Sequence, residues 1–130
     1  MSSIDDAKSA WIQTYTGRAF YPLDPKPEDV DIIDIAHALS MQCRFTGHVN
    51  RFYSVAEHSV WVSRQVPKED AMWGLLHDAS EAYLIDLCRP LKRYSDLGAR
   101  YREIESKVMA AIVDRFGLVP SEPESVSIAD

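Results

Sequence analysis

GLLHDASEAYLIDL, residues 74–87, joins a helical apolar pattern to a histidine–aspartate pair. At 100° per residue the apolar side chains gather on one helical face, which predicts a packing surface made of Met72, Leu75, Leu76, Ala79 and Tyr83. A second face, within an arc of about 100°, carries Gly74, His77, Asp78 and Glu81. We expect this helix to run from Lys68 to about Tyr83, with the glycine leaving its polar face uncrowded.

Two helices are predicted upstream of this stretch. Apolar residues at helical spacing indicate a helix over residues 32–43. Ser54 and Glu57 form an S-x-x-E capping box, so a second helix begins after Ser54 and ends near Gln65. Residues 44–53, between these helices, are predicted to be a loop.

One further helix is predicted downstream. Apolar residues recur on one stripe over residues 99–116, while Gly117 is a good C-terminal cap and Pro120 blocks continuation. The segment RPLKR, residues 89–93, is predicted to be a loop.

The N-terminal region has a different character. WIQTYTGRAFYPLDP, residues 11–25, is rich in aromatic and β-branched residues and is broken by Gly17 and Pro22, which is typical of a hairpin or extended arm. The sequence therefore predicts an all-α helical bundle with a short extended or hairpin N-terminal arm, forming one domain over residues 1–130.

The composition excludes several classes of protein. The formal net charge of −6 argues against a duplex nucleic acid partner. Cys43 and Cys88 form no CxxC pair, so we expect free thiols in a reducing compartment. No secretory signal or membrane-length apolar run is visible, and the expected location is cytoplasmic, away from membranes.

Two histidines and two aspartates are candidate metal ligands. His58 lies nineteen residues before the His77-Asp78 pair, and Asp130 closes the segment SVSIAD. Antiparallel packing of the helices around His58 and His77 would bring these groups together. Imidazole and carboxylate ligands together suit one divalent metal, which can generate hydroxide near neutral pH. The alternatives are a hydrogen-bonded core histidine at position 58 and a solvated polar face around His77.

Other polar residues suggest phosphate chemistry. Glu81 and Asp86 could supply the base and acid of a phosphoester hydrolysis, or could be a helix-surface glutamate and a loop-capping aspartate. Arg44 and Lys92 are candidate phosphate ligands, and His48 could assist Arg44. We interpret Arg18 and Arg93 as surface charges, and His37 as structural.

Several motifs together resemble the HD-domain phosphohydrolase superfamily, in particular small bacterial and phage HD proteins related to 5′-deoxynucleotidases. The resemblance spans nearly the whole chain and is carried by YTGRAFYPLDP, DIAHALSMQCRFTGH, FYSVAEHSV, LLHDASEAYLIDLCRPLKRY and SIAD. It implies an HD-domain bundle whose metal ligands are His58, His77, Asp78 and Asp130. It also implies that Glu81 and Asp86 are the catalytic carboxylates, and that Arg44 binds phosphate or orders the active site.

The same resemblance implies one divalent metal ion (cobalt, manganese, magnesium, iron or zinc) and a homodimer or larger oligomer. The expected activity is hydrolysis of the 5′-phosphate of a (deoxy)nucleoside monophosphate. One alternative is a triphosphohydrolase that releases triphosphate from a nucleotide, and another is a non-catalytic metal or nucleotide sensor. Relatives of this type continue past the closing aspartate, and one alternative is that the natural chain extends beyond Asp130. The other alternative is that Asp130 is weakly held, because chain ends fray.

Overall fold

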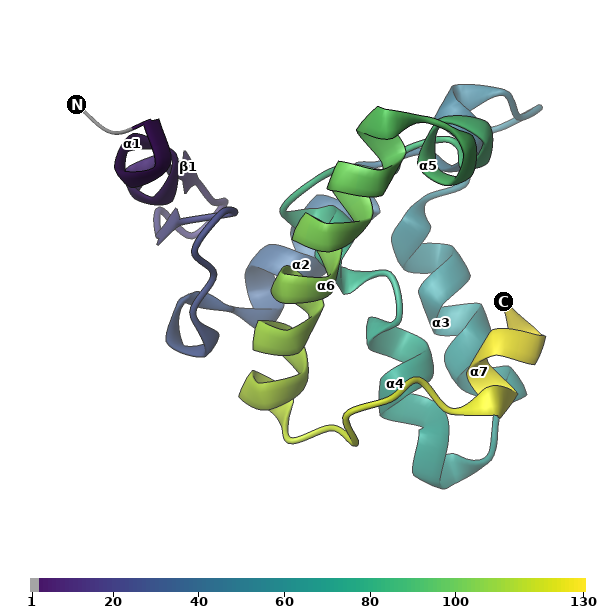
Figure 1. Ribbon diagram of the computed structural model, residues 1–130. Helices are drawn as coiled ribbons and strands as arrows, with labels where there is room; N and C mark the ends of the chain where they lie inside the picture. Colours follow the sequence, from purple (N-terminus) through teal and green to yellow (C-terminus); the bar gives the residue numbers. More distant parts are fainter. Residues whose placement is uncertain (1–2) are drawn as a thin grey trace.

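The computed structural model describes residues 3–130 as an all-α bundle with a small extended arm (Figure 1). Its helices and strands are α1 (Ser3–Ser9), β1 (Ile12–Gln13), β2 (Ala19–Phe20), α2 (Ile32–Ser40), α3 (Val55–Gln65), α4 (Ala71–Leu76), α5 (Arg89–Tyr94), α6 (Asp96–Phe116) and α7 (Glu124–Ala129). Short 3₁₀ turns occur at η1 (Pro27–Asp29), η2 (Arg44–Gly47), η3 (Lys68–Asp70) and η4 (Ala79–Ala82). Within residues 3–130, each helix is too short or too polar to cross a membrane.

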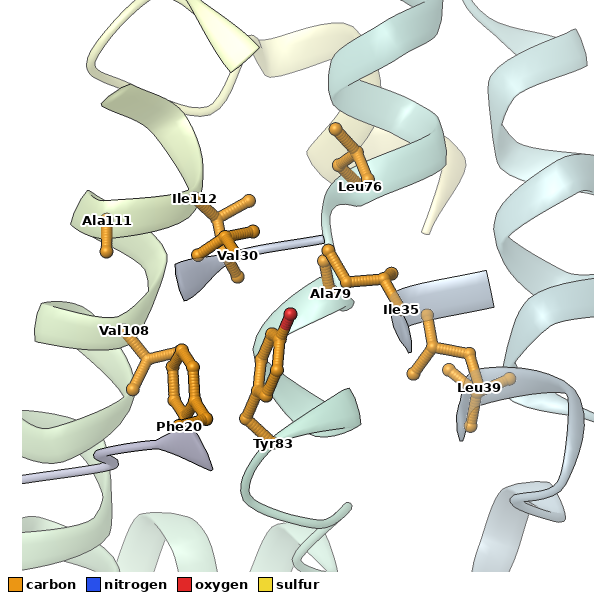
Figure 2. Close-up of a cluster of buried hydrophobic side chains, with 11 residues drawn as sticks. Phe20, Val30, Ile35, Leu39, Leu76, Ala79, Tyr83, Val108, Ala111 and Ile112 are labelled. Atoms are coloured by element: carbon orange, nitrogen blue, oxygen red, sulfur yellow. The ribbon is translucent and has the colours of Figure 1, made fainter. Parts of the chain in front are cut away.

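The main core lies where α2, η4 and α6 meet, and the arm inserts one aromatic ring into it (Figure 2). Phe20 of β2 is fully buried and stacks on Tyr83, with 3.9 Å between the ring centroids. A second apolar cluster joins α3, α4 and α7 through Val62, Trp73 and Val126. The C-terminal helix is therefore packed on the bundle by its own buried side chain.

The arm is a hairpin, as the sequence predicted. β1 and β2 pair antiparallel, with Ile12 opposite Phe20. The turn between them is fixed to α2 by Asp34, whose buried carboxylate accepts hydrogen bonds from the backbone N–H and the hydroxyl of Thr16 at 2.7 and 3.0 Å. His37 of the same helix stacks on Tyr15, with 3.7 Å between the ring centroids.

Local capping signals are confirmed where they were strong. Ser54 is the N-cap of α3, and its side-chain oxygen accepts the N–H of Glu57 at 2.9 Å. Gly117 ends α6 in the left-handed conformation, with φ of 64°. The helix begins three residues earlier than predicted, at Asp96, because Ser95 caps it by accepting the N–H of Gly98.

The continuous helix predicted from Lys68 to Tyr83 is wrong. Helix α4 ends at Leu76, the chain turns at Asp78, and η4 follows. Aspartate and serine lose little by leaving a helix interior, and tertiary packing overrides weak helix propensity. The turn buries Glu81, which a continuous helix would have left on the polar face. The predicted packing face is also wrong at Met72, which lies in α4 before the turn and is 50% exposed.

Gly74 has a different role from the one expected. A Cβ atom at this position would lie 3.1 Å from the Cα atom of Ser63, which belongs to α3. The glycine therefore permits close approach of α4 to α3, rather than leaving an open polar surface. This approach brings the end of α4 near the middle of α3.

Two further boundaries differ from prediction. Helix α2 ends at Ser40 rather than Cys43, because the following residues pair with the start of α3: Cys43 forms an isolated bridge with Ser54. The segment RPLKR is not a loop but most of helix α5, with proline in its first turn, where its missing N–H is tolerated.

We predict that Gly98→Ala destabilises the corner between α5 and α6. A Cβ atom at Gly98 would overlap the backbone carbonyl oxygens of Leu91 and Lys92, which cannot rotate away. The free energy of unfolding should fall by roughly 2 kcal/mol or more, measured by urea denaturation. Ala99→Gly is the control, and its cost should stay within about 1 kcal/mol of helix propensity. Equal stability of Gly98→Ala and wild type would contradict this close approach.

Candidate metal centre

The four predicted metal ligands converge from three separate segments. His58 lies in α3, His77 and Asp78 follow α4, and Asp130 follows α7. One ligand atom from each residue lies within 4.8 Å of the others. Ligand atoms that each lie about 2.1 Å from one ion stand roughly 3 to 4 Å apart, so this cluster could hold a metal ion.

The carboxylate of Asp130 links the two imidazoles. Its Oδ1 atom lies 2.7 Å from Nε2 of His58 and 3.2 Å from Nε2 of His77. Oδ2 of Asp78 lies 3.0 Å from the same nitrogen of His77. Two ring nitrogens and two carboxylate oxygens thus face a common point, which is the mixed donor set of a divalent metal site.

A hydrogen bond to the other ring nitrogen, Nδ1, fixes the orientation of the His77 imidazole. Its Nδ1–H donates a hydrogen bond to the carbonyl oxygen of Gly74 at 2.6 Å. A backbone carbonyl in this position is the usual partner of a metal-binding histidine, because it sets the ring orientation and leaves the other nitrogen as ligand. Gly74 therefore contributes to the site twice, through its missing side chain and through its carbonyl group.

The charges in the cluster are strongly coupled. Burial lowers the pKa of His77, but hydrogen bonds to Asp130 and Asp78 outweigh it and raise that pKa to about 10. The hydrogen bonds from His58 and then His77 hold the pKa of the Asp130 carboxyl well below its usual range. At a pH below this pKa, Nε2 of His77 carries a proton at the position where a metal ion would bind.

Asp130 is held by ordered structure, so the alternative of a weakly fixed fourth ligand is wrong. Its backbone N–H donates to the carbonyl oxygen of Val126 at 2.9 Å, and the Val126 side chain is fully buried. The hydroxyl of Ser125 donates to the carboxylate of Asp70 at 2.7 Å, which attaches the start of α7 to the start of α4. The sequence reasoning missed α7 because the helix has only six residues.

A cleft of about 820 Å³ adjoins the cluster, and the predicted catalytic and substrate-binding residues line it. Asp78 and Asp130 form part of its wall. The same wall contains Arg44, His48, Glu81, Asp86 and Lys92. The fold thus brings together, in one cleft beside the metal ligands, residues from the turn η2, the segment after α4 and helix α5.

Glu81 and Asp86 differ in their surroundings. Glu81 is buried, and within residues 3–130 its Oε2 atom finds no hydrogen-bond partner. Burial, together with the nearby charges of Asp78 and Asp86, raises the pKa of the Glu81 carboxyl to about 10. Asp86 is exposed. The pair therefore combines a carboxyl group that keeps its proton with one that faces solvent.

The cationic residues are also held differently from one another. The guanidinium group of Arg44 lies over the rings of Phe45 and Tyr53, at 4.5 and 5.3 Å from their centroids. The ammonium group of Lys92 is paired with the carboxylate of Glu105 at 3.1 Å, so part of its charge is already neutralised. His48 is exposed at the cleft.

Sequence reasoning missed several residues of the cleft wall. Arg93, which we interpreted as a surface charge, lines the cleft, as do Arg89, Arg102 and Glu105. Arg102 and Glu105 lie one helical turn apart on α6. The close packing of α5 on α6, which brings these residues to the cleft, was not visible in the sequence.

The chain is similar to proteins of unknown function. It is 44% identical over 121 residues to the uncharacterized protein YfdR of Escherichia coli, and 38% identical over 131 residues to an uncharacterized protein of Rhodobacter capsulatus. These alignments cover 93% and 94% of this chain, and the chain spans 66% of the length of each relative. No family model matches the chain.

We predict that metal binding releases protons. Because the pKa of His77 is about 10 without a metal, an ion that binds Nε2 must displace a proton at any lower pH. Below that pKa, the affinity for Mn²⁺ should rise by up to about tenfold per pH unit. Calorimetry near pH 7.5 in two buffers of different ionisation enthalpy should show about one proton released per ion. Identical heats in both buffers would contradict the protonated His77.

We also predict that Asp130→Asn weakens the metal site. The amide keeps the size of the side chain but loses the charge that faces both imidazoles. Removal of this ligand should reduce Mn²⁺ affinity by at least about 100-fold, and should abolish any rise in melting temperature that Mn²⁺ produces in the wild type. Asp114→Asn, at an exposed position on α6, is the control. Equal Mn²⁺ affinity of both variants would exclude Asp130 as a ligand.

Proposed function

We propose that this protein is a metal-dependent phosphohydrolase that acts on nucleotides and removes the 5′-phosphate of (deoxy)nucleoside monophosphates. The observation that carries the proposal is the arrangement of one cleft. Its wall joins Asp78 and Asp130 of the metal cluster to the buried carboxyl group of Glu81, whose pKa is raised to about 10, and to the side chains of Arg44, Arg89, Arg93 and Arg102. The resemblance to HD-domain phosphohydrolases supports the same assignment.

Each residue has a definite task in this proposal. His58, His77, Asp78 and Asp130 would hold a divalent ion of cobalt, manganese, magnesium, iron or zinc. Such an ion supplies Lewis-acid stabilisation of phosphate oxygens and lowers the pKa of water. Arg44 binds the phosphate through its planar guanidinium group, and its stacking on two rings orients it for this contact. His48, which lines the same cleft, would add a second donor.

Glu81 is the proton donor of the proposed reaction. A carboxyl group with a pKa of about 10 carries a proton at neutral pH. As a water oxygen bonds to phosphorus and the ester P–O bond breaks, Glu81 can transfer this proton to the leaving 5′-oxygen, while the proton lost by the water passes to solvent. Asp86, whose charge contributes to that raised pKa, keeps the proton on Glu81 before the transfer. After the transfer, Glu81 is a carboxylate and regains a proton from solvent through the open cleft.

The alternative of a triphosphohydrolase gains one supporting observation. Arg89, Arg93 and Arg102 line the cleft beyond the predicted substrate residues, and a triphosphate needs more cationic partners than a monophosphate. We keep the monophosphate as the first proposal, because Lys92 is already paired with Glu105.

Product analysis tests the function, with carboxylate variants as the critical comparison. Purified protein with Mn²⁺ or Co²⁺ is incubated with each deoxynucleoside mono- and triphosphate, and the products are separated by anion exchange. Glu81→Gln and Asp86→Asn should each lower kcat by about 100-fold or more while Mn²⁺ still binds. Glu103→Gln, at an exposed residue of α6 that pairs with Arg100, should keep wild-type activity.

Each outcome of this experiment decides between functions. Inorganic phosphate released from monophosphates supports the proposal, whereas intact triphosphate released from a triphosphate supports the alternative. Metal binding without any product would leave a metal or nucleotide sensor. Undiminished activity in both carboxylate variants would exclude Glu81 and Asp86 from catalysis.

A further inference from the structure

Ile85 adopts a backbone conformation that is unfavourable for its residue type. Its φ angle is 121°, in the region that favours glycine, although isoleucine is β-branched. The side chain is 61% exposed, so packing in the core does not account for the conformation. Strained residues of this kind persist where surrounding contacts hold them, often beside functional groups. Ile85 directly precedes Asp86 and is four residues after Glu81.

Hydrogen bonds from two distant elements hold this segment. The hydroxyl of Tyr101, in α6, donates to the carbonyl oxygen of Ile85. The side-chain amide of Gln42, just after α2, donates to the carbonyl oxygen of Glu81 at 3.0 Å. The N–H of Ile85 donates to that same oxygen at 3.1 Å, which closes the segment into one turn.

The contact at Ile85 controls the direction of Asp86. The carbonyl group of Ile85 and the N–H of Asp86 belong to one planar peptide unit. Because Tyr101 fixes the oxygen of that unit, it also fixes how the chain enters Asp86. Asp86 is exposed, so its position depends on this backbone more than on packing.

The surroundings of Tyr101 keep its hydroxyl group as a donor. Burial, followed by the nearby charge of Glu105, raises the pKa of Tyr101, so the group stays protonated. The ammonium group of Lys92 lies over its ring at 5.6 Å from the centroid, and Lys92 is itself paired with Glu105. The ring is therefore held between α5 and α6 while its hydroxyl reaches the turn.

We propose that Tyr101 is a positioning residue, which holds the strained turn at Ile85 and thereby places Asp86 beside Glu81 for phosphoester hydrolysis. The inference rests on the proposed function for its catalytic part. Its structural part, that the hydroxyl group holds the turn, can be measured without turnover.

The test compares Tyr101→Phe with Tyr94→Phe. Loss of the Tyr101 hydroxyl should lower kcat by about tenfold or more, with KM and Mn²⁺ affinity within about twofold of wild type. Hydrogen exchange of residues 84–88 should become at least about tenfold faster. Tyr94 is 87% exposed, and its variant should match wild type in all these measurements.

A second variant separates positioning from general stability. Without the Tyr101 hydroxyl, isoleucine should relax from positive φ and turn Asp86 away, but glycine tolerates the original conformation. The double variant Ile85→Gly/Tyr101→Phe should therefore recover kcat by about threefold or more over Tyr101→Phe alone. A tyrosine that merely stabilised the fold would show no such rescue.

The outcomes distinguish this inference from the proposed function. Wild-type kcat in Tyr101→Phe, with inactive Glu81→Gln, would overturn the positioning role and leave the phosphohydrolase standing. Slow catalysis without faster exchange or rescue would overturn it as well. An inactive wild type would overturn the catalytic role together with the proposed function, and the exchange measurement would then decide whether Tyr101 holds the turn.

Discussion

Two imidazole rings meet inside this protein, and the carboxylate of Asp130 lies against both. Buried polar nitrogens are costly unless they have partners, so the packing of α3 on α4 depends on a group from outside these helices. Helix α7 delivers that group, and Val126 anchors the helix in the apolar cluster between α3 and α4. The docking of α7 thus supplies both the buried Val126 and the carboxylate that contacts the two imidazoles, and this carboxylate also lines the cleft.

The sequence predicted those features that a few neighbouring residues decide. Ser54 and Gly117 mark helix ends through their own hydrogen bonds and backbone freedom, and both were located correctly. The break after α4 was not visible, because residues 74–87 keep a helical apolar pattern across it. What ends the helix there is the burial of Glu81 and Tyr83 against other elements, and no local signal carries that information.

In the candidate site, too, some features were predictable from the sequence and others were not. His58 and His77 were expected to meet, because two helices joined by a short link pack as neighbours, and they do. Which charges would be free was not predictable, since this depends on residues far away in the chain. The charge of Lys92 is partly neutralised by Glu105 of α6, while Arg102, one turn before Glu105 on α6, lines the cleft. Long-range pairs of this kind are fixed only when α5 and α6 are placed together.

The two histidines of the candidate metal cluster are buried, whereas its two aspartates face solvent. The side chains of His58 and His77 are 5% and 2% exposed, whereas those of Asp78 and Asp130 are 29% and 42% exposed. Any ion that binds must therefore enter and leave past the two carboxylates. Asp130 follows directly after the short helix α7. Brief undocking of α7 would therefore move the Asp130 carboxylate away from His58 and His77. If a divalent ion occupies this cluster, its exchange rate would therefore report on how firmly α7 is docked.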